Sequence, residues 1–294
     1  MKSDNARSKA YRIASIIILG ILALLFLFPL YWIVTGAFKP AADIYAQKPV
    51  WVPTQWVGNN FQKLFDRRTA PLFELFGIVG PTVPAVFRWL INTVFMAVAA
   101  MVLTCITAAM AGYALAKKRF WGRSILFGLI VCAMALPKQV ILIPLLREMS
   151  FLGVYGSLWA VIFPTVGWPF GVFLMKQFSE SIPGEILEAA RVDGSSELRT
   201  FTTIVVPMVK PGIGALAIFT FINSWNDYFM QLIMLDSNDF YTISLGIATL
   251  QAETSIDMGI LMAGAALAAI PIIIVFLIFQ KYFTQGITMG AVKG

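Results

Sequence analysis

The most specific residue pattern in the chain lies in a polar segment, residues 176–210. A glutamate, two alanines, an aspartate and a glycine follow one another there at short intervals: Glu188, Ala189, Ala190, Asp193 and Gly194. A carboxylate offers a partner an ionic contact, small side chains let a second surface approach closely, and glycine suits a helix end, where a positive φ is often required. The pattern predicts a docking surface, with a solvated loop or a helix lying on lipid headgroups as the alternative.

Two short helices must present these residues. Pro183 and the acidic residues after it favour a helix over 185–192, because proline fits the first turn and acidic side chains there interact well with the helix dipole. Ser195 or Ser196 can cap a second helix over 197–206. The two helices together predict a compact knob.

Catalytic chemistry has little support in the composition. The chain has no histidine, and its two cysteines, Cys105 and Cys132, lie in apolar runs without a Cys-x-x-Cys spacing. These facts exclude serine–histidine triads and histidine metal ligands, and they indicate buried thiols without a disulfide framework. No GxxxxGK[ST] phosphate-binding loop is present, so the chain is not expected to bind ATP or to be an enzyme. No cofactor or metal is expected in it.

A second set of polar residues follows one face of the apolar segment 208–235. Its spacing of i, i+3, i+7 and i+11 is that of one helical stripe, formed by Thr220, Asn223, Asp227 and Gln231. We predict that Thr220, Asn223 and Asp227 line a polar path. Interfacial anchoring or a subunit contact is the alternative, because Asp227 lies about 25 Å along the helix from its basic end, at about 1.5 Å per residue.

Trp168 is a further candidate for that path. It stands between Gly167 and Pro169 at a break in the apolar run 155–175. The flat face of an aromatic ring can stack on the C–H groups of a substrate, so such a stacking contact is one prediction for this side chain. Packing in the core or against another subunit is the alternative.

The elements that carry these residues are expected to span a membrane. Of the 294 residues, 59% are apolar and 13% are charged, whereas a soluble domain has about 45–50% apolar and about 25% charged residues. A bilayer core of about 30 Å requires roughly 20 apolar residues per spanning helix. We predict an all-α integral membrane protein with one transmembrane domain over 1–294 and six transmembrane helices, near residues 13–37, 89–116, 124–146, 155–175, 208–235 and 259–281.

Prolines interrupt two of these spans. Pro137 and Lys138 break the third, whose later part is expected to be kinked or interfacial, and Pro164 and Pro169 break the fourth. Such breaks are tolerated where neighbouring helices satisfy the freed backbone groups. The first span is too long for a signal peptide and lacks a small-residue cleavage site, so we predict an uncleaved anchor.

Lysines and arginines predict the orientation of the spans. They cluster at the N-terminus, after span two, in the segment 176–210 and in the C-terminal tail, whereas residues 211–280 have none. Since basic flanks face the cytoplasm, the N- and C-termini and the segment 176–210 are expected there, with loops 38–87 and 236–258 outside. The net charge of +7 thus reflects topology, and no nucleic-acid partner is expected.

The motifs together resemble a known family. Three residues separate Glu188-Ala189-Ala190 from Gly194, and nine more separate Gly194 from Ile204-Val205-Val206-Pro207. This spacing resembles the Glu-Ala-Ala motif in the cytoplasmic loop of binding-protein-dependent ATP-binding-cassette (ABC) importer permeases, with a valine in place of a leucine. The run Phe221-x-x-Ser224-Trp225-Asn226-Asp227 and the tail 290–294 resemble the carbohydrate-uptake branch, of the maltose-transporter type.

The resemblance implies a type I ABC importer permease fold in a bacterial inner membrane, surrounded by lipid. Glu188, Ala189, Ala190 and Gly194 would form a coupling helix on a dimer of separate ATPase subunits, which would hold ATP and Mg²⁺. Asp193 would belong to that contact or only cap the helix. A second permease subunit would complete the path for a sugar or oligosaccharide, which an external solute-binding protein would deliver.

The resemblance also implies that the external segment 236–258 contacts the binding protein. In maltose-type permeases the corresponding loop reaches into the cleft of that protein, and its tip is expected here at 246–253. The contact residues that this implies are Gly246, Thr249, Gln251 and Glu253.

Two other classes of membrane protein are alternatives. An ion-coupled secondary transporter typically has intramembrane charges or broken helices in paired repeats, and this chain shows broken helices without a repeat. A membrane enzyme needs a nucleophile or a metal constellation, which the absence of histidine disfavours. The sequence does not name the sugar: the five basic residues in loop 38–87 suit an acidic oligosaccharide, an acidic binding protein and interfacial anchoring equally well.

Overall fold

The computed structural model describes residues 2–75, 78–252 and 257–291, and most of its regular structure is helical. Four helical segments in the described residues are long and apolar enough to cross a membrane: Tyr11–Ala37, Ala85–Lys117, Trp159–Glu180 and Met258–Gln280. Two bent helix pairs also pass that test, which gives up to six candidate spans if each pair counts as one. Much of the apolar sequence therefore lies in helices that are long enough to cross a membrane.

The chain divides into two compact units, residues 1–69 with 247–270 and residues 70–246 with 271–294. The first contains α1 (Lys2–Ala37), α2 (Ala41–Ile44), α3 (Asn59–Arg67) and parts of α14 (Ile243–Ala252) and α15 (Met258–Ala291). Within it the buried amide of Asn60 donates to the carbonyl oxygens of Ala37 and Lys39, at 3.0 and 2.9 Å. These bonds satisfy carbonyls that the end of α1 leaves open.

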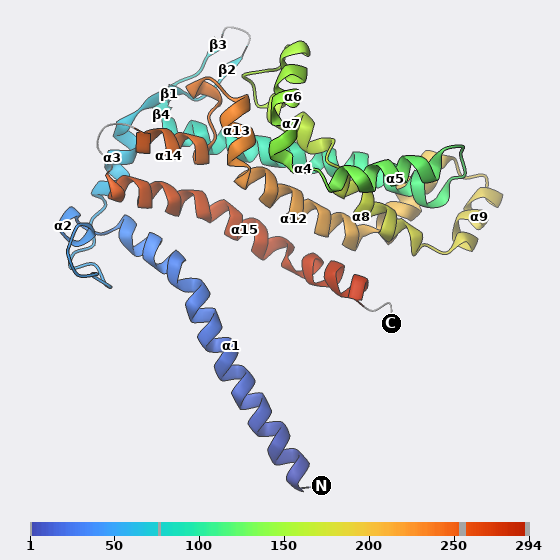
Figure 1. The fold of residues 1–294 in the computed structure, drawn as a ribbon, viewed down its shortest axis with the longest axis horizontal. Coiled ribbons are helices and arrows are strands. Elements are labelled where there is room, and N and C mark those ends of the chain that lie inside the picture. Colours follow the sequence, from blue (N-terminus) through green and yellow to red (C-terminus); the bar gives the residue numbers. More distant parts are fainter. Residues whose placement is uncertain (1, 76–77, 253–256, 292–294) are drawn as a thin grey trace. The chain divides into compact units, whose positions relative to one another are not determined.

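The second unit is built around α4 (Ala85–Lys117). This helix packs against α7, α8 and α12, which run along it in Figure 1. The unit's other elements are β1 (Thr69–Pro71), β2 (Glu74–Leu75), β3 (Ile78–Val79), β4 (Thr82–Pro84), α5 (Arg123–Met134), α6 (Lys138–Phe151), α7 (Trp159–Val166), α8 (Pro169–Glu180), α9 (Gly184–Val192), α10 (Glu197–Thr200), η1 (Phe201–Val205), α11 (Val206–Met208), α12 (Lys210–Asn226), α13 (Tyr228–Met234) and η2 (Asn238–Phe240).

Small residues on one face of α4 set how closely its neighbours approach. They recur at intervals of three and four residues and are all buried: Ala97, Ala100, Thr104, Ala108 and Gly112. A Cβ atom on Gly112 would lie 2.6 Å from the backbone of α8, and Gly171 of α8 rests in turn against Ala108 and Thr104. Small residues allow membrane helices to pack at such short range.

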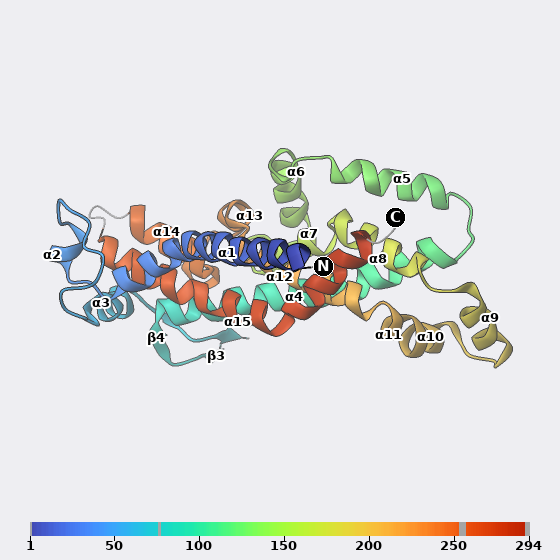
Figure 2. The ribbon, with the colours of Figure 1, turned by 90° about the horizontal axis from the view of Figure 1, so that it is seen from below.

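Besides the 78° bend between Glu197–Met208 and Lys210–Asn226, three apolar segments are broken. α5 and α6 meet at 109° (Figure 2), α7 is separated from α8 by Gly167 and Trp168, and α12 is separated from α13 by Asp227. Prolines predicted the first two breaks. The third has no proline, and the prediction of one stripe continuing to Gln231 is wrong, because the helix that carries Thr220 ends before Asp227.

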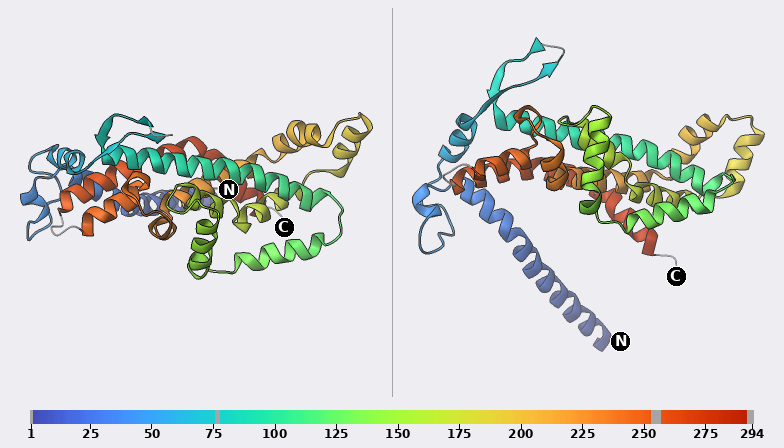
Figure 3. Two further views of the ribbon diagram at one scale, coloured as in Figure 1. Left: turned by 90° about the horizontal axis from the view of Figure 1, so that it is seen from above. Right: turned by 45° about the horizontal axis from the view of Figure 1, so that its top comes forward.

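Residues 69–84 form two small strand pairs, which the all-α prediction omits. β2 pairs antiparallel with β3, and β1 pairs with β4; both pairs are drawn as cyan arrows in Figure 3. Prolines end β1 and β4, where the strands need no further ladder hydrogen bonds. The second helix of the segment 176–210 also differs from its prediction, since it is divided into α10, the π-helical turn η1 and α11.

Gly112→Ala tests the close approach of α4 and α8. The added methyl group meets the α8 backbone at 2.6 Å, which only a backbone shift can relieve, so we expect the free energy of unfolding to fall by about 1–3 kcal/mol. Gly128→Ala on α5 is the control, because a Cβ atom there has open space. Thermal melting of the purified protein in detergent measures both, and equal melting temperatures for the two variants would contradict this packing.

Candidate functional site

The docking surface predicted from the sequence is a helix with a defined end. α9 spans Gly184–Val192, and Gly194 follows it with a φ of +73°. The N–H of Gly194 donates to the carbonyl oxygen of Arg191 at 3.1 Å, and the N–H of Ser195 to that of Ala190 at 2.9 Å. These bonds satisfy open carbonyls at the helix end, and a side chain at Gly194 would strain the turn.

The predicted docking residues do not all face outwards. Glu188, Ala189, Asp193 and Gly194 are exposed, whereas Ala190 is buried. Glu188 and Arg191 line a hollow of about 630 Å³ together with basic residues at the end of α4, Lys117, Lys118 and Arg119. The surface therefore combines the exposed carboxylates of Glu188 and Asp193 with a group of cations that the sequence analysis assigned only to topology.

Two lysines at the end of α4 bind the chain segments on either side of α9. The ammonium group of Lys117 donates to the carbonyl oxygens of Ile182, at 2.6 Å, and Glu180, at 3.1 Å. Lys118 forms an ion pair with Glu197 and lies over the ring of Tyr113. Burial lowers the pKa of Lys118, but hydrogen bonds to Glu197 and Tyr113 hold it above its usual value. Lys118 therefore stays charged at neutral pH.

A second site lies where the helix breaks meet. Lys138, the first residue of α6, forms an ion pair with Asp227, and 3.0 Å separates Nζ from Oδ2. The same Nζ lies 4.8 Å from the ring centre of Trp168, the residue before α8, which is a favourable cation–π distance. Oδ1 of Asp227 accepts from the N–H of Met230 at 3.4 Å and caps α13. One ion pair thus connects three broken segments.

A hollow of about 60 Å³ lies beside this ion pair. Three of the predicted path residues, Trp168, Thr220 and Asn223, line it together with Lys138. Asp227 is not among the lining residues and contributes by holding Lys138. The rest of the lining consists of Thr104, Thr165, Phe170, Gly171, Leu216 and Phe219.

Gln231, the last member of the predicted stripe, lies elsewhere. Its side chain is fully buried, and its amide donates to the carbonyl oxygen of Ser224 at 3.0 Å. It therefore stabilises the junction of α12 and α13 and lines no part of the hollow.

Sequence analysis did not identify Lys138 as a site residue. A lysine inside an apolar run is the signal that could have identified it, because charges within membrane segments are rare and usually functional. Its partner follows 89 residues later, and no local pattern links the two. Among the described residues, no group of three or more Cys, Asp or Glu side chains could hold a metal ion.

The residues predicted to contact an external partner belong to α14 or follow it. Gly246 is buried, and a Cβ atom there would collide with the ring of Trp89, so this residue is not at an exposed tip. Thr249 is half-buried, Gln251 is exposed, and Glu253 lies outside the described residues.

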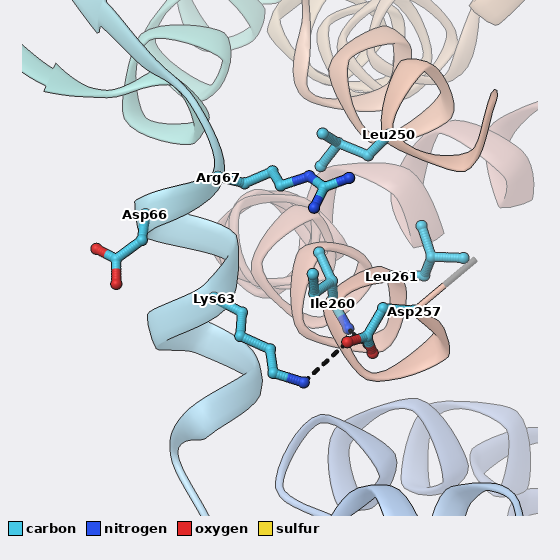
Figure 4. Close-up of a pocket in the computed structure, with 7 residues that line it drawn as sticks. All are labelled: Lys63, Asp66, Arg67, Leu250, Asp257, Ile260 and Leu261. Atoms are coloured by element: carbon cyan, nitrogen blue, oxygen red, sulfur yellow. Dashed lines mark hydrogen bonds and ion pairs between the residues drawn. The ribbon is translucent and has the colours of Figure 1, made fainter. Parts of the chain in front are cut away.

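A cavity of about 440 Å³ lies in the first unit (Figure 4). Lys63 of α3 forms an ion pair with Asp257 at 2.9 Å, and Oδ1 of Asp257 accepts from the N–H of Gly259 at 3.0 Å, which caps α15. Burial raises the pKa of Asp257, but the hydrogen bonds from Lys63 and the helix backbone hold it below its usual value. The pair fixes the start of a membrane-length helix.

Comparison with known proteins assigns the chain to a family. Residues 108–289, more than half of the chain, match the family described as the binding-protein-dependent transport system inner membrane component. The chain belongs to this family. The matched region of the permease contains both α9 and the Lys138–Asp227 ion pair.

Relatives of this permease are described as sugar-uptake proteins. AraQ, the arabinooligosaccharides transport system permease protein of Bacillus subtilis (strain 168), is 33% identical over 294 residues and covers 100% of both chains. MdxG, the maltodextrin transport system permease protein of the same organism, is 30% identical over 299 residues, again with 100% of both chains.

A solved structure shows the same fold. The crystal structure of a bacterial ABC transporter involved in the import of the acidic polysaccharide alginate contains a chain that matches with a TM-score of 0.78 and 23% identity. The match covers 94% of this chain and 97% of that chain. The fold is therefore that of type I ABC importer permeases.

Neutralising one member of the ion pair tests its contribution to stability. Lys138→Gln or Asp227→Asn leaves a partly buried charge without its partner, so we expect the free energy of unfolding to fall by about 1–3 kcal/mol. The double variant removes both charges and is expected to melt closer to the unmodified protein than either single variant. Thermal melting in detergent at fixed pH and salt measures this, and strictly additive losses would show that the two side chains do not interact.

Proposed function

We propose that this chain is a permease subunit of an ATP-driven importer that carries a sugar or an oligosaccharide. The observation that carries the proposal is its full-length similarity to permeases named for sugar uptake. Together with a second, different permease subunit, the chain forms the translocation path for a substrate delivered by an external binding protein. It hydrolyses no ATP itself, and a dimer of separate ATPase subunits holds ATP and Mg²⁺.

The proposed setting is a bacterial inner membrane, which the chain crosses several times. Both termini and α9 face the cytoplasm. The support for this orientation is the distribution of lysine and arginine, which flank the cytoplasmic ends of spans and are absent from residues 211–280.

In this proposal α9 is the coupling helix that contacts the ATPase. Glu188, Ala189 and Asp193 are exposed and available for that contact, while Ala190 packs inwards and Gly194 makes the turn that ends the helix. A helix held rigidly in a cleft can transmit closure of the ATPase as a rigid-body motion. Lys117 then passes the motion to α4, because it binds the chain immediately before α9.

The proposed path runs past the hollow at the helix breaks. Trp168 offers an aromatic face, and Thr220 and Asn223 offer polar groups, a combination that suits a ligand with C–H faces and hydroxyl groups. On the external side, Thr249, Gln251 and Glu253 are proposed to contact the binding protein, whereas Gly246 of α14 is buried against Trp89.

An ion-coupled secondary transporter is the second candidate, and one observation favours it. The pairing of Lys138 with Asp227 places two opposite charges between apolar helices, and intramembrane charges commonly mark ion or proton pathways. The two candidates differ in their source of energy, so one experiment separates them.

That experiment is reconstitution of the whole transporter in liposomes. The chain is assembled with its second permease, its ATPase and its binding protein, and uptake of radiolabelled arabinotriose and maltotriose is measured. We expect uptake of at least one sugar that requires enclosed ATP and is insensitive to ionophores. Uptake that follows an ion gradient without ATP would establish the second candidate, and failure to take up either sugar would overturn the proposed substrate class.

Reversal of one charge on α9 tests the coupling surface. Glu188→Lys is expected to lower ATP-driven uptake by at least about tenfold, because reversing a charge within an interface costs more than about 1.4 kcal/mol. Glu185→Lys reverses the same charge on an exposed side chain one turn earlier and is expected to change uptake less than twofold. Equal uptake by the two variants would contradict a specific role for Glu188.

A further inference from the structure

Two arginines in the loop between α4 and α5 have no acidic partner in the described part of the chain. Arg119 is exposed and forms no hydrogen bond there, and Arg123 donates one, from Nη1 to the carbonyl oxygen of Lys118 at 3.2 Å. Both arginines line one hollow of the loop, and none of the described residues that line it with them is acidic. No aspartate or glutamate occurs between Glu74 and Glu148. The two guanidinium groups are therefore available to an anion from outside the chain.

A turn at Gly122 brings these arginines to the same hollow. Gly122 has a φ of +81°, a conformation that glycine adopts at little cost, and α5 begins at the next residue. Arg119 thus lies before the turn and Arg123 after it, and both line the hollow. A guanidinium group presents its donors in a fork that matches phosphate oxygens, so two such groups suit one phosphate group.

Large apolar side chains beside the arginines are exposed. Trp121 is 95% exposed, Ile125 67% and Phe120 44%. Ile125 belongs to α5, and none of the 12 residues of this helix is buried, so the exposed apolar surface continues from the loop along α5. A covered aromatic side chain buries about 150–250 Å², which makes an apolar environment for Trp121 favourable.

The loop lies at one border of the membrane. It joins α4, which is long and apolar enough to cross a membrane, to α5, which passes the same test together with α6. Figures 1 and 2 show this loop at the same end of the second unit as α9. In the proposed orientation that end faces the cytoplasm. Tryptophan and arginine are favoured at this depth, where lipid headgroups meet water.

A lipid headgroup accounts for both parts of this surface. A free phosphate ion would pair with the arginines but would leave Trp121 and Ile125 in water. A soluble partner protein could cover the loop, but the exposed apolar surface continues along α5, whose apolar side chains extend into the membrane. An anionic phospholipid supplies a phosphate group and an apolar chain at the same border.

We propose that the loop between α4 and α5 binds an anionic phospholipid of the cytoplasmic leaflet. Arg119 and Arg123 hold its phosphate group, and Trp121 lies among the glycerol and the first methylene groups of the acyl chains. The inference rests on the proposed orientation in the membrane and adds a partner of stated chemistry, with named contact residues.

Removal of the two positive charges tests the site in the full-length chain, purified in detergent and freed of lipid. Native mass spectrometry measures the Kd of the first bound phosphatidylglycerol, and phosphatidylcholine with the same acyl chains is the neutral probe. Arg119→Gln/Arg123→Gln is expected to raise the Kd for phosphatidylglycerol about 25-fold, at about fivefold per arginine, and to change that for phosphatidylcholine less than about threefold. An unchanged Kd for phosphatidylglycerol would overturn the proposal.

Arg191→Gln/Arg199→Gln is the matched control. It removes the same charge from two exposed arginines of α9 and α10, so the Kd for phosphatidylglycerol is expected to stay within about twofold. An equal rise in this variant would show attraction to net charge and no site at the loop. All four substitutions are outside the helix contacts of the unit's interior, so unchanged melting temperatures are expected and check that the variants fold.

Trp121→Ala tests the apolar half of the site. Because the ring carries no charge, its loss is expected to raise the Kd of both lipids by the same factor, about tenfold. The preference for phosphatidylglycerol over phosphatidylcholine is therefore expected to survive in Trp121→Ala and to be lost in Arg119→Gln/Arg123→Gln. Unchanged binding of both lipids by Trp121→Ala would contradict the position proposed for the ring.

The assembled transporter separates a lipid from a protein partner at the loop. With the second permease and the ATPase present, the difference in Kd between the unmodified transporter and Arg119→Gln/Arg123→Gln is expected to persist. Its disappearance on assembly would show that a subunit covers the loop and would overturn the proposal. Failure of sugar uptake in liposomes would overturn the proposed function and leave these lipid measurements unaffected, so the two failures are distinguishable.

Discussion

The ion pair between Lys138 and Asp227 is the contact on which the interior of the second unit depends. A helix that breaks inside a membrane has no water to satisfy its freed backbone groups, so the protein must supply partners. Here Asp227 caps α13, Lys138 begins α6, and the lysine lies over Trp168 just before α8. A single electrostatic contact thus stabilises three broken ends, and it does so without leaving a net charge among apolar helices.

The face of α4 that packs against α8 also contributes to the hollow beside Lys138. The stripe of small residues brings α8 to within backbone contact at Gly112 and places Gly171 against Thr104. Thr104 belongs to this stripe and also lines the hollow. Close helix packing and part of the lining of the hollow therefore belong to the same face of α4.

Local features of this fold could be predicted from sequence, and non-local ones could not. The boundaries of α9, the positive φ of Gly194 and the break before Lys138 follow from proline, glycine and acidic residues within a few positions. The break at Asp227 has no proline to mark it, and its ion pair joins residues 89 positions apart. Gly246 shows the same limit: loop character suggested an exposed tip, whereas contact with Trp89, far away in sequence, buries it inside a helix.

The hydrogen bonds of Lys117 to the segment before α9 affect how the sequence of that segment can vary. Its ammonium group binds the main-chain oxygens of Glu180 and Ile182 and not their side chains. Every amino acid supplies that oxygen, so substitutions at positions 180 and 182 leave the acceptors in place, and the joint depends on the lysine alone. The side chains of the segment before α9 can therefore diverge while its contact with the end of α4 stays in place.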